Sequence, residues 1–410
     1  MQKLELDSTM MADDVEEEIR LAPVGCSELY LNCVHLDLEI SSAIARLFHS
    51  SVSWKSIEME ECTGQVSVLL AMIMAQKVVK LKVVSLSFGR LSEASLFALA
   101  VGMRSNTWLK SLTLTLTLTE EDAAIFSSGL TSSSLKRLCM WDCRLDTPAT
   151  QALAQGIEAA ASLKYFGLVA CDQCDDRLEI LTRALAHHPT LTSLDFRCLA
   201  SGIAPVADLL RENHNILDLD LSFRSGSEAI HLPTLAAAVQ NHPSLLCLHL
   251  CGNLLTDDDV ETILDCTMSL QTLNLSLNSI SDEGISRVAS YIATNQKGLQ
   301  RLFLQTNPFT EVGARALLTA MATNTEIEEL CIPNELADIQ AQLNYYARLN
   351  QGGRRLVLGN CSVPLAMWPM IFERADRLEW DESQWDETLN DVGRAEVVYC
   401  LLHGTLFFPV

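Results

Sequence analysis

A Leu-x-x-Leu-x-Leu phrase recurs along most of this chain at a nearly constant spacing, and no other feature limits the fold as strongly. The last apolar residue of each phrase marks one repeat. The twelve markers are Leu31, Met59, Leu86, Leu114, Met140, Leu168, Phe196, Leu221, Leu250, Leu275, Leu304 and Ile332. Successive markers lie 25 to 29 residues apart. A period of this length predicts a solenoid, in which each repeat stacks on its neighbours and one core runs through the whole array.

Each repeat begins with a short strand followed by a turn. In the tenth repeat, Leu270, Leu273 and Leu275 alternate with polar residues, so they are expected to point inward from a strand. Three positions after the last leucine stands Asn278, whose amide can satisfy backbone groups that no regular ladder reaches. The same position is held by Asn253, Asn307, Cys62, Cys143 and Cys171. We therefore predict buried turn residues, with a thiol replacing the amide in the earlier repeats.

A helix is expected in the second half of each repeat. Asp282 and Glu283 suit a helix start, where the helix dipole favours negative charge. The apolar residues that follow have the i, i+3, i+4, i+7 spacing that buries one helix face. Asparagine tolerates the left-handed conformation common at helix C-termini, which predicts helix ends at Asn106, Asn213, Asn241, Asn295 and Asn324.

These repeats resemble those of leucine-rich repeat proteins of the ribonuclease-inhibitor class. The resemblance covers roughly residues 26–350 and implies an α/β horseshoe solenoid of about twelve repeats, with a concave parallel sheet and convex helices. It also implies a surface that binds proteins. The regular two-repeat alternation of ribonuclease inhibitor itself is missing, so its nuclease contacts are not carried over.

The ends of the chain depart from the repeat. We expect residues 1–25 to form an N-terminal cap, residues 26–335 the repeat domain, and residues 336–410 a helical C-terminal cap. Within the last segment, one helix should stop at the Gly352-Gly353 pair, and two more are expected around residues 364–374 and 396–407. The phrases YYARLNQGGRRL and VPLAMWPMIFERA also resemble C-terminal ends of leucine-rich repeat proteins of diatoms, a resemblance that implies no activity.

The charge balance indicates what kind of partner the chain attracts. The formal net charge is −23, from 52 acidic and 29 basic residues. Such an excess of acid repels nucleic-acid backbones and anionic membranes and favours a basic protein partner. The start of the chain lacks an apolar signal-peptide region, and no stretch approaches eighteen apolar residues. The 14 scattered cysteines then suggest reduced thiols, so the expected location is the cytoplasm or the nucleus.

The strand register predicts which side chains occupy the open face of the sheet, where solenoids bind. Aromatic residues and arginines are the side chains that dominate binding hot spots. Trp141 and Tyr165 are expected on adjacent strands beside Arg137, with carboxylates further along. The predicted partner-binding residues are Tyr30, Glu58, Glu60, Arg137, Trp141, Asp142, Tyr165, Asp195, Arg197, Asp218, Asp220, Phe223, His249, Arg301 and Phe303. Glu61 and Phe88 were expected on the same face. The alternative interpretation is that these aromatic residues do not mark a binding surface, because scattered exposed aromatic residues are normal in proteins.

Chemical alternatives have weaker support from the sequence. The Cys171-x-x-Cys174 motif, with Cys143, Cys198 and the histidines at 187–188, offers metal-ligand chemistry. Cys171, however, already has a structural role at the turn, so neither a metal nor any other cofactor is expected. The catalytic motifs of common enzyme classes are missing, and we expect no enzymatic activity.

The runner-up function is regulation of a GTPase. The phrase SLSFGRLSEASLFAL is similar to one in the leucine-rich repeat proteins that activate the nuclear-transport GTPase. The resemblance implies that Arg90, which follows the third strand, contacts a nucleotide phosphate in trans. A solvated loop cation is the simpler interpretation of Arg90.

Overall fold

The computed structural model describes residues 2–7, 17–18, 26–47, 55–74, 83–169, 171, 175–197, 203–222, 231–267, 269–294, 298–352 and 354. The chain divides into two compact units, Met1–Leu245 and Leu246–Val410. From residue 26 on, both are built from strand, turn, helix and loop in alternation, and the fold is the predicted α/β leucine-rich repeat solenoid. Each unit is described by itself below.

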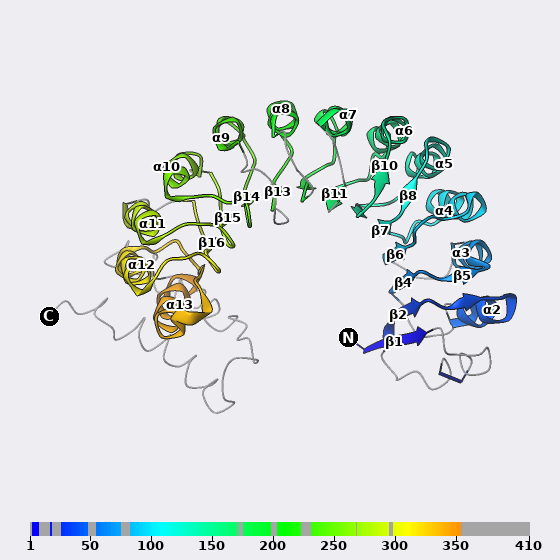
Figure 1. The fold of residues 1–410 in the computed structure, drawn as a ribbon, viewed down its shortest axis with the longest axis horizontal. Coiled ribbons are helices and arrows are strands. Elements are labelled where there is room, and N and C mark those ends of the chain that lie inside the picture. Colours follow the sequence, from blue (N-terminus) through cyan, green and yellow to red (C-terminus); the bar gives the residue numbers. More distant parts are fainter. Residues whose placement is uncertain are drawn as a thin grey trace, which may run out of the picture. The chain divides into compact units, whose positions relative to one another are not determined.

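In the first unit a parallel sheet carries a layer of helices on one side only (Figure 1). Its strands, in spatial order, are β1 (Gln2–Asp7), β2 (Cys26–Asn32), β4 (Ser56–Glu60), β6 (Val83–Ser87), β7 (Ser111–Thr115), β9 (Arg137–Trp141), β11 (Tyr165–Val169), β12 (Ser193–Asp195) and β13 (Asp218–Asp220). Its helices are α2 (Leu38–Leu47), α3 (Val66–Met74), α4 (Glu93–Ser105), α5 (Glu120–Leu130), α6 (Thr147–Glu158), α7 (Asp175–Ala186), α8 (Ala204–Glu212) and α9 (Leu232–Gln240). Short strand pairs, β3 (His35–Leu36) with β5 (Thr63–Gly64) and β8 (Thr117–Leu118) with β10 (Arg144–Leu145), join neighbouring turns. The side of the sheet away from the helices is called the strand face.

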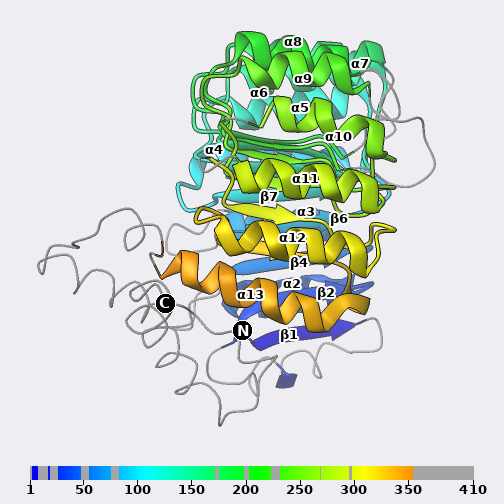
Figure 2. The ribbon, with the colours of Figure 1, turned by 90° about the vertical axis from the view of Figure 1, so that its left-hand side faces the viewer.

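The second unit repeats the same plan. Its parallel strands are β14 (Cys247–His249), β15 (Thr272–Asn274), β16 (Arg301–Phe303) and β17 (Glu329–Cys331). Its helices are α10 (Asp257–Asp265), α11 (Asp282–Thr294), α12 (Glu311–Thr323) and α13 (Ala337–Gln351), with a short 3-10 turn η1 (Asn334–Leu336) before α13. Figure 2 shows α11, α12 and α13 lying side by side as one layer.

The register of the sheet follows the sequence period. Leu31 pairs with Met59, Met59 with Leu86, and Leu86 with Leu114. Parallel strands with this register place equivalent residues side by side, so the inward leucines form continuous rows. All four of these residues are fully buried, as are the markers in the second unit. Their removal from water is the main stabilising contribution, at about 1.5–3 kcal/mol for each large side chain.

The turn residues form the predicted ladder between repeats. The Nδ2 group of Asn278 donates to the carbonyl oxygens of Leu250 at 3.0 Å and Leu275 at 2.9 Å. Its Oδ1 atom accepts from the backbone N–H groups of Asn253 and Leu255. Thiols take over the donor role in the first unit, as expected: Sγ of Cys62, Cys143 and Cys171 lies 3.5, 3.3 and 3.3 Å from the carbonyl oxygens of Leu31, Leu114 and Met140. We call these side chains the turn ladder.

The residue before a ladder position takes a left-handed backbone conformation. The φ angles of Glu61, Asp142, Leu277 and Thr306 are 45°, 46°, 56° and 55°. Such values are uncommon for residues with a Cβ atom. They let the chain turn sharply out of the strand so that the ladder side chain points into the core.

Helices end at Asn106, Asn213, Asn241 and Asn324 as predicted, but the predicted left-handed conformation of these residues was wrong. Asn106, Asn213 and Asn324 cap helices but have negative φ angles of −95°, −97° and −73°. Their side chains instead bind backbone: Oδ1 of Asn324 accepts from Glu326 and Ile327, and its Nδ2 donates to Ile292 of the preceding repeat. Asn213 likewise reaches the preceding repeat, since its Nδ2 donates to the Leu185 carbonyl oxygen at 2.8 Å, and Asn295 lies outside the described residues.

Helix starts in the second unit are capped by the preceding repeat. Helix α11 begins at Asp282 as predicted, and Oδ1 of this residue accepts from the N–H groups of Thr310 and Gly313, both at 2.8 Å. Asp257 does the same for Ser281 and Gly284. A Cβ atom on Gly284 would lie 2.3 Å from Oδ1 of Asp257, so a side chain there would displace the cap.

The two ends of the chain are described only in part. Residues 2–7 form strand β1, which pairs in parallel with β2. Helix α13 ends at Gln351, directly before Gly352, where the sequence predicted a helix end. The other helices expected around 364–374 and 396–407 lie outside the described residues, so the caps stay predictions. Within the described ranges, no helix combines the length and apolar character needed to span a bilayer.

Candidate functional site on the strand face

Three zones follow one another across the strand face of the first unit. The first, the acidic patch, is formed by Glu5, Asp7, Glu28, Tyr30, Glu58 and Glu60 on strands β1, β2 and β4. The second, the hydroxyl strip, consists of Ser85, Ser87, Ser111, Thr113 and Thr115 on β6 and β7. The third, the aromatic-arginine cluster, consists of Arg137, Trp141, Tyr165, Asp195, Arg197 and Asp220 on or beside β9, β11, β12 and β13. The register therefore separates acid, neutral hydroxyl and aromatic chemistry along one surface.

The acidic patch surrounds one half-buried tyrosine. The hydroxyl of Tyr30 donates to the Glu60 carboxylate on the neighbouring strand, and this hydrogen bond, with burial and the nearby carboxylates, raises the pKa of Tyr30 to about 12. Glu58 pairs directly with Tyr30 across the strands and is exposed. The patch therefore carries negative charge at neutral pH with a neutral phenol at its centre.

Tyr165 lies across the sheet rather than standing up from it. Its hydroxyl donates to Oδ2 of Asp195 at 2.7 Å, on the next strand. The ring passes over Gly167, where a Cβ atom would lie 2.9 Å from the phenol oxygen. The Arg137 guanidinium carbon stacks 3.4 Å from the ring centroid on the outer side. Burial, followed by the hydrogen bond to Asp195, raises the pKa of Tyr165 well above its ordinary value.

Arg197 is held in a fixed position by two carboxylates. It donates from Nε to Oδ1 of Asp195 at 2.8 Å and from Nη2 to Oδ2 at 2.6 Å, and it lies 3.4 Å from a carboxylate oxygen of Asp220. The Asp195 hydrogen bonds raise the pKa of Arg197 above its ordinary value. Its guanidinium carbon is 5.4 Å from the ring centroid of Trp141, a cation–π distance. Trp141 itself is 42% exposed and forms the outermost apolar surface of the cluster.

The structure places most of the predicted residues as the register required. Those on the strand face of the first unit are Tyr30, Glu58, Glu60, Arg137, Trp141, Tyr165, Asp218 and Asp220, with Arg197 just after β12. Asp218 accepts from the Ser193 hydroxyl at 2.9 Å. His249, Arg301 and Phe303 lie on the strand face of the second unit, on β14 and β16. Phe223 lies outside the described residues.

Three expectations about this face need correction. Asp195 is only 3% exposed, because Tyr165 and Arg197 cover its carboxylate, so it positions other side chains and presents no free charge. Phe88 is buried, since it lies two positions after the inward Leu86 and shares its side of the chain. Asp142 is exposed but lies in the left-handed turn after β9, at the edge of the face.

Two residues that lie beneath the cluster and support it were not identified from the sequence. Gly167 gives Tyr165 the room to lie flat, and Cys139, which is 3% exposed, packs beside it with Sγ 3.2 Å from the ideal Cβ position of Gly167. A glycine inside the strand phrase YFGLV was the available signal, because glycine in a strand often marks the close approach of another group.

The arrangement of the described residues does not support the alternative of a metal site. Among them, no group of three or more His, Cys, Asp or Glu side chains is placed to hold an ion. Cys143 and Cys171 are next to each other, with the Cys143 N–H donating to Sγ of Cys171 at 3.3 Å, but both thiols belong to the turn ladder. His188 is buried and contacts the Ala160 carbonyl oxygen at 3.1 Å. Cys174 and Cys198 lie outside the described residues.

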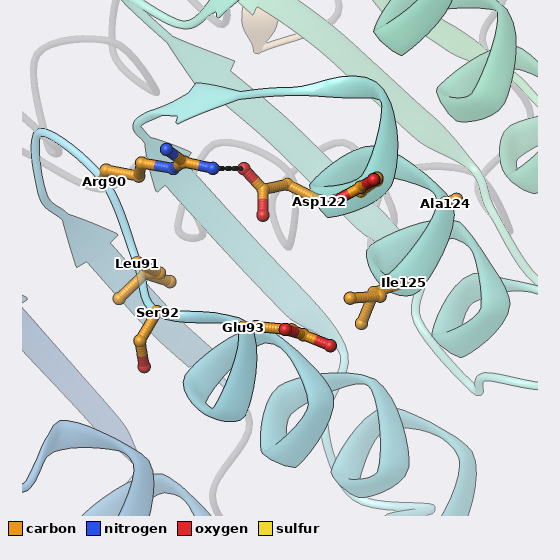
Figure 3. A pocket seen from close by; sticks show the side chains of 8 residues that line it. Arg90, Leu91, Ser92, Glu93, Asp122, Ala124 and Ile125 are labelled. Atoms are coloured by element: carbon orange, nitrogen blue, oxygen red, sulfur yellow. Dashed lines mark hydrogen bonds and ion pairs between the residues drawn. The ribbon is translucent and has the colours of Figure 1, made fainter.

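Arg90 lies at a separate pocket on the other side of the first unit. The pocket has a volume of about 710 Å³ and lies between the start of α4 and the start of α5 (Figure 3). Its lining residues are Arg90, Leu91, Ser92, Glu93, Glu121, Asp122, Ala124 and Ile125. Arg90 donates to the Asp122 carboxylate at 3.1 Å, and its side chain remains 62% exposed.

The repeats, the parallel register and the turn ladder define the chain as a leucine-rich repeat protein. No family model matches the chain. It is similar to three human proteins, named NACHT, LRR and PYD domains-containing proteins 14, 5 and 13, at 24%, 27% and 27% identity over 363, 166 and 232 residues. These alignments cover 74%, 37% and 54% of this chain and 33%, 13% and 22% of the relatives. The chain therefore spans a third or less of the length of each of these relatives.

Two bacterial proteins are among the solved structures that the chain resembles. The leucine-rich repeat-containing protein LegL7 of Legionella pneumophila matches with a TM-score of 0.45 and 15% identity, over 84% of this chain and 97% of that one. A protein from Bacteroides fragilis matches with a TM-score of 0.41 and 12% identity, over 62% of this chain and 74% of that one.

Proposed function

We propose that this protein is a non-catalytic interaction scaffold that binds a basic segment of a partner protein on the strand face of its first unit. The observation that carries the proposal is the exposed Trp141 ring, held beside a fixed Arg197 and followed across the sheet by the acidic patch. Tryptophan, tyrosine and arginine are the side chains that contribute most to binding when a partner covers them. Here they are already fixed, so little side-chain freedom is lost on binding.

The two charged zones have different roles in this proposal. Arg197 is neutralised by Asp195 and Asp220, so the aromatic-arginine cluster attracts an apolar group more than an anion. Negative charge is concentrated in the acidic patch, where the exposed Glu58 is the most accessible carboxylate on β4. A lysine or arginine of the partner would pair there, in agreement with the net charge of −23.

The spacing of the strands sets the length of the partner segment. Strands β4, β6, β7 and β9 are successive neighbours, and Trp141 lies two residues further along the register than Glu58, so the two positions are about 16 Å apart. An extended chain covers this distance in about four to five residues. The proposed ligand is an extended segment with Lys or Arg and an aromatic or large apolar residue about four to five positions apart, passing over the hydroxyl strip.

Binding of a labelled peptide that contains a lysine pair and a phenylalanine at this spacing tests the proposal by fluorescence anisotropy. Replacing Trp141→Ala is expected to weaken binding by about 2 kcal/mol, or roughly thirtyfold, if the ring is a hot spot. Glu58→Lys should weaken binding most at low salt, because screening already reduces the attraction at high salt.

Matched variants separate these effects from general damage. Trp108 is 44% exposed, nearly the same as Trp141, but it follows helix α4, so Trp108→Ala is the control for the ring. Glu158→Lys on helix α6 changes the net charge by the same amount as Glu58→Lys. Equal losses in target and control variants would show that the strand face is not the binding surface.

The runner-up function, activation of a GTPase through Arg90, has less support. The guanidinium is paired with Asp122, which is 6% exposed, and a transferred phosphate would have to replace this partner. If the wild-type chain accelerates GTP hydrolysis by a GTPase and Arg90→Ala does not, this result would favour the regulatory function over the scaffold.

We also retain the ribonuclease-inhibitor-like class and a cytoplasmic or nuclear location as parts of the proposal. The cysteines whose side chains the structure describes, among them Cys62, Cys143 and Cys171, form no disulfide bonds, which fits a reducing compartment.

A further inference from the structure

Helix α4 carries an apolar line on its solvent side. Glu93, Phe97 and Val101 are four residues apart and therefore lie along one line of the helix. Phe97 is 60% exposed and Val101 is 40% exposed, while the residues between them, Leu96, Leu99 and Ala100, form the buried side. An exposed phenylalanine on a helix that already buries a full apolar face is not needed for the core.

The neighbouring helices continue this apolar surface. Helix α3 has the sequence VSVLLAMIM and contains no charged residue, and its Ala71 is exposed. On helix α5, Ala124 is exposed and Ile125 is half-buried. Helices α3, α4 and α5 pack side by side in this order. The surface is named the α3–α5 patch. Contiguous exposed apolar surface of this kind marks an interaction site more often than single exposed residues do.

A pocket with acidic walls closes the patch at the start of the helices. Glu93 on α4 and Glu121 on α5 both line it, and both are exposed. Figure 3 shows Glu93 and Ile125 on the two helices that enclose the pocket, with Arg90 turned toward Asp122. Because Arg90 is held by Asp122 at 3.1 Å, the pocket has two more carboxylates than its own cation can balance. A cation entering from outside would find negative charge next to an apolar surface.

We infer that the α3–α5 patch docks an amphipathic helix of a partner protein, with the helix's apolar side on Phe97 and a lysine or arginine at its end in the pocket between Glu93 and Glu121. The charge pattern favours this occupant: carboxylates lie at one end of the patch, the exposed Phe97 and Val101 lie in the middle, and the exposed Arg104 lies at the other end. Helix α4 has 13 residues and is about 20 Å long, so a partner helix of about 13 residues would cover it. Anchors at i, i+3, i+4 and i+7 are the known pattern for such docking.

This inference is independent of the strand face, since the two surfaces lie on opposite sides of the same layer of repeats. A second copy of this chain is the main competing occupant. That possibility predicts self-association through Phe97, without a need for a basic helix end.

The test uses the full chain and a labelled helical peptide of about 13 residues with leucines at i, i+3, i+4 and i+7 and two lysines at one end. Fluorescence anisotropy should show saturable binding, weakened at least tenfold by Phe97→Ser and severalfold by Glu93→Lys. Replacing the two lysines of the peptide by glutamates should weaken binding to the wild-type chain and restore it partly to Glu93→Lys. Val312→Ser on helix α12 removes a 67% exposed valine and is the matched control, expected to bind normally.

Circular dichroism of each variant confirms that the fold is retained before binding is compared, and Phe97→Leu provides a conservative variant that should bind nearly as well as wild type. Equal affinity for the lysine and glutamate peptides, or unchanged binding by Phe97→Ser, would overturn the inference. Sedimentation that reveals a dimer lost in Phe97→Ser would also overturn it, by assigning the patch to a second copy.

Discussion

The turn ladder shows how much one side chain contributes to a repeat. Asn278 both donates to carbonyl oxygens and accepts two N–H groups, whereas the thiol of Cys143 makes one weak hydrogen bond to Leu114. Both side chains are buried, so an unmade hydrogen bond is not replaced by water. The amide therefore organises the turn of its own repeat and of the preceding one, and the thiols do the same through fewer and weaker hydrogen bonds: Sγ of Cys171 accepts from the Cys143 N–H and donates to Met140.

Replacing Asn278→Ala should lower the free energy of unfolding by about 3 kcal/mol. The change leaves the buried N–H groups of Asn253 and Leu255 without their acceptor, at about 1–3 kcal/mol for each buried unsatisfied group. Urea unfolding followed by circular dichroism measures the effect. Asn278→Cys should be less harmful than Asn278→Ala, because the thiol can still donate, and the exposed Ser279→Ala in the same loop should change little. A loss equal to that of Ser279→Ala would contradict the role of the ladder.

At this scale the sequence predicted positions better than conformations. Spacing alone located Cys62 and Asn307 in the turn ladder, since each lies three positions after an inward residue. It could not predict that Asn324 binds backbone of another repeat, because a helix end looks the same in sequence whichever partner its side chain finds. The burial of Asp195 depends on Arg197, which reaches back over it from beyond the strand.

Helices in the second unit depend on carboxylates from the helix before them. Asp282 belongs to the first turn of α11 and caps α12, so one residue serves two elements. Desolvation of the carboxylate raises its pKa, but the hydrogen bonds from Thr310 and Gly313 outweigh this and hold the pKa of Asp282 below its ordinary value of 3.8.

This shift predicts how stability depends on pH. Because the folded-state pKa is lower than the unfolded one, the contribution of Asp282 is fully present above about pH 4 and is lost as the pH falls through the folded-state value. Asp282→Asn should therefore unfold more easily at pH 7, by about 1 kcal/mol as for a lost cap, and the difference from wild type should shrink below pH 4.

Urea titrations at several pH values measure this change. Asp258→Asn, which removes an exposed carboxylate from the first turn of α10, is the matched control and should show no such convergence. A difference between wild type and Asp282→Asn that stays constant down to acid pH would rule out the proposed linkage.

The elements themselves were largely predictable, whereas their lateral contacts were not. The apolar period located the strands and the helix start at Asp282. Nothing in a single repeat shows that Tyr165 crosses Gly167 to reach Asp195, because this contact joins two strands that are about thirty residues apart. The candidate site was thus predicted as a set of residues but not as a network.

At the scale of the whole molecule, the acid excess opposes compactness. Carboxylates outnumber cations by 52 to 29, so exposed charges repel one another on average. The ion pairs between successive turns of one helix, such as Arg287 with Glu283 on α11, are exposed and contribute little. Long-range repulsion is expected to dominate the response to ionic strength.

Added salt should therefore stabilise the fold. Raising NaCl from about 20 to about 200 mM shortens the screening length to below roughly 10 Å and weakens repulsion between distant carboxylates. The urea midpoint is expected to increase over this range, and Glu158→Lys, with a less negative net charge, should show a smaller increase. A midpoint that falls with salt would mean that local ion pairs outweigh the net charge.

The period of the sequence predicted the repeat architecture, because a marker residue can be buried only when the markers of the neighbouring repeats pack against it. Composition predicted the sign of the surface but not its distribution into an acidic patch, a hydroxyl strip and an aromatic-arginine cluster. That distribution depends on which strands are neighbours, and only the register of the sheet provides this information.

The turn ladder also gives each stack a direction. Asn307 donates to Leu275 of the preceding repeat, just as Asn278 donates to Leu250, so these repeats present carbonyl acceptors on one side and side-chain donors on the other. Cutting between any two such repeats would leave the same unmatched acceptors and donors on the two new surfaces. A repeat could for this reason be duplicated in head-to-tail order without redesigning the joint, whereas a reversed repeat would bring donors against donors.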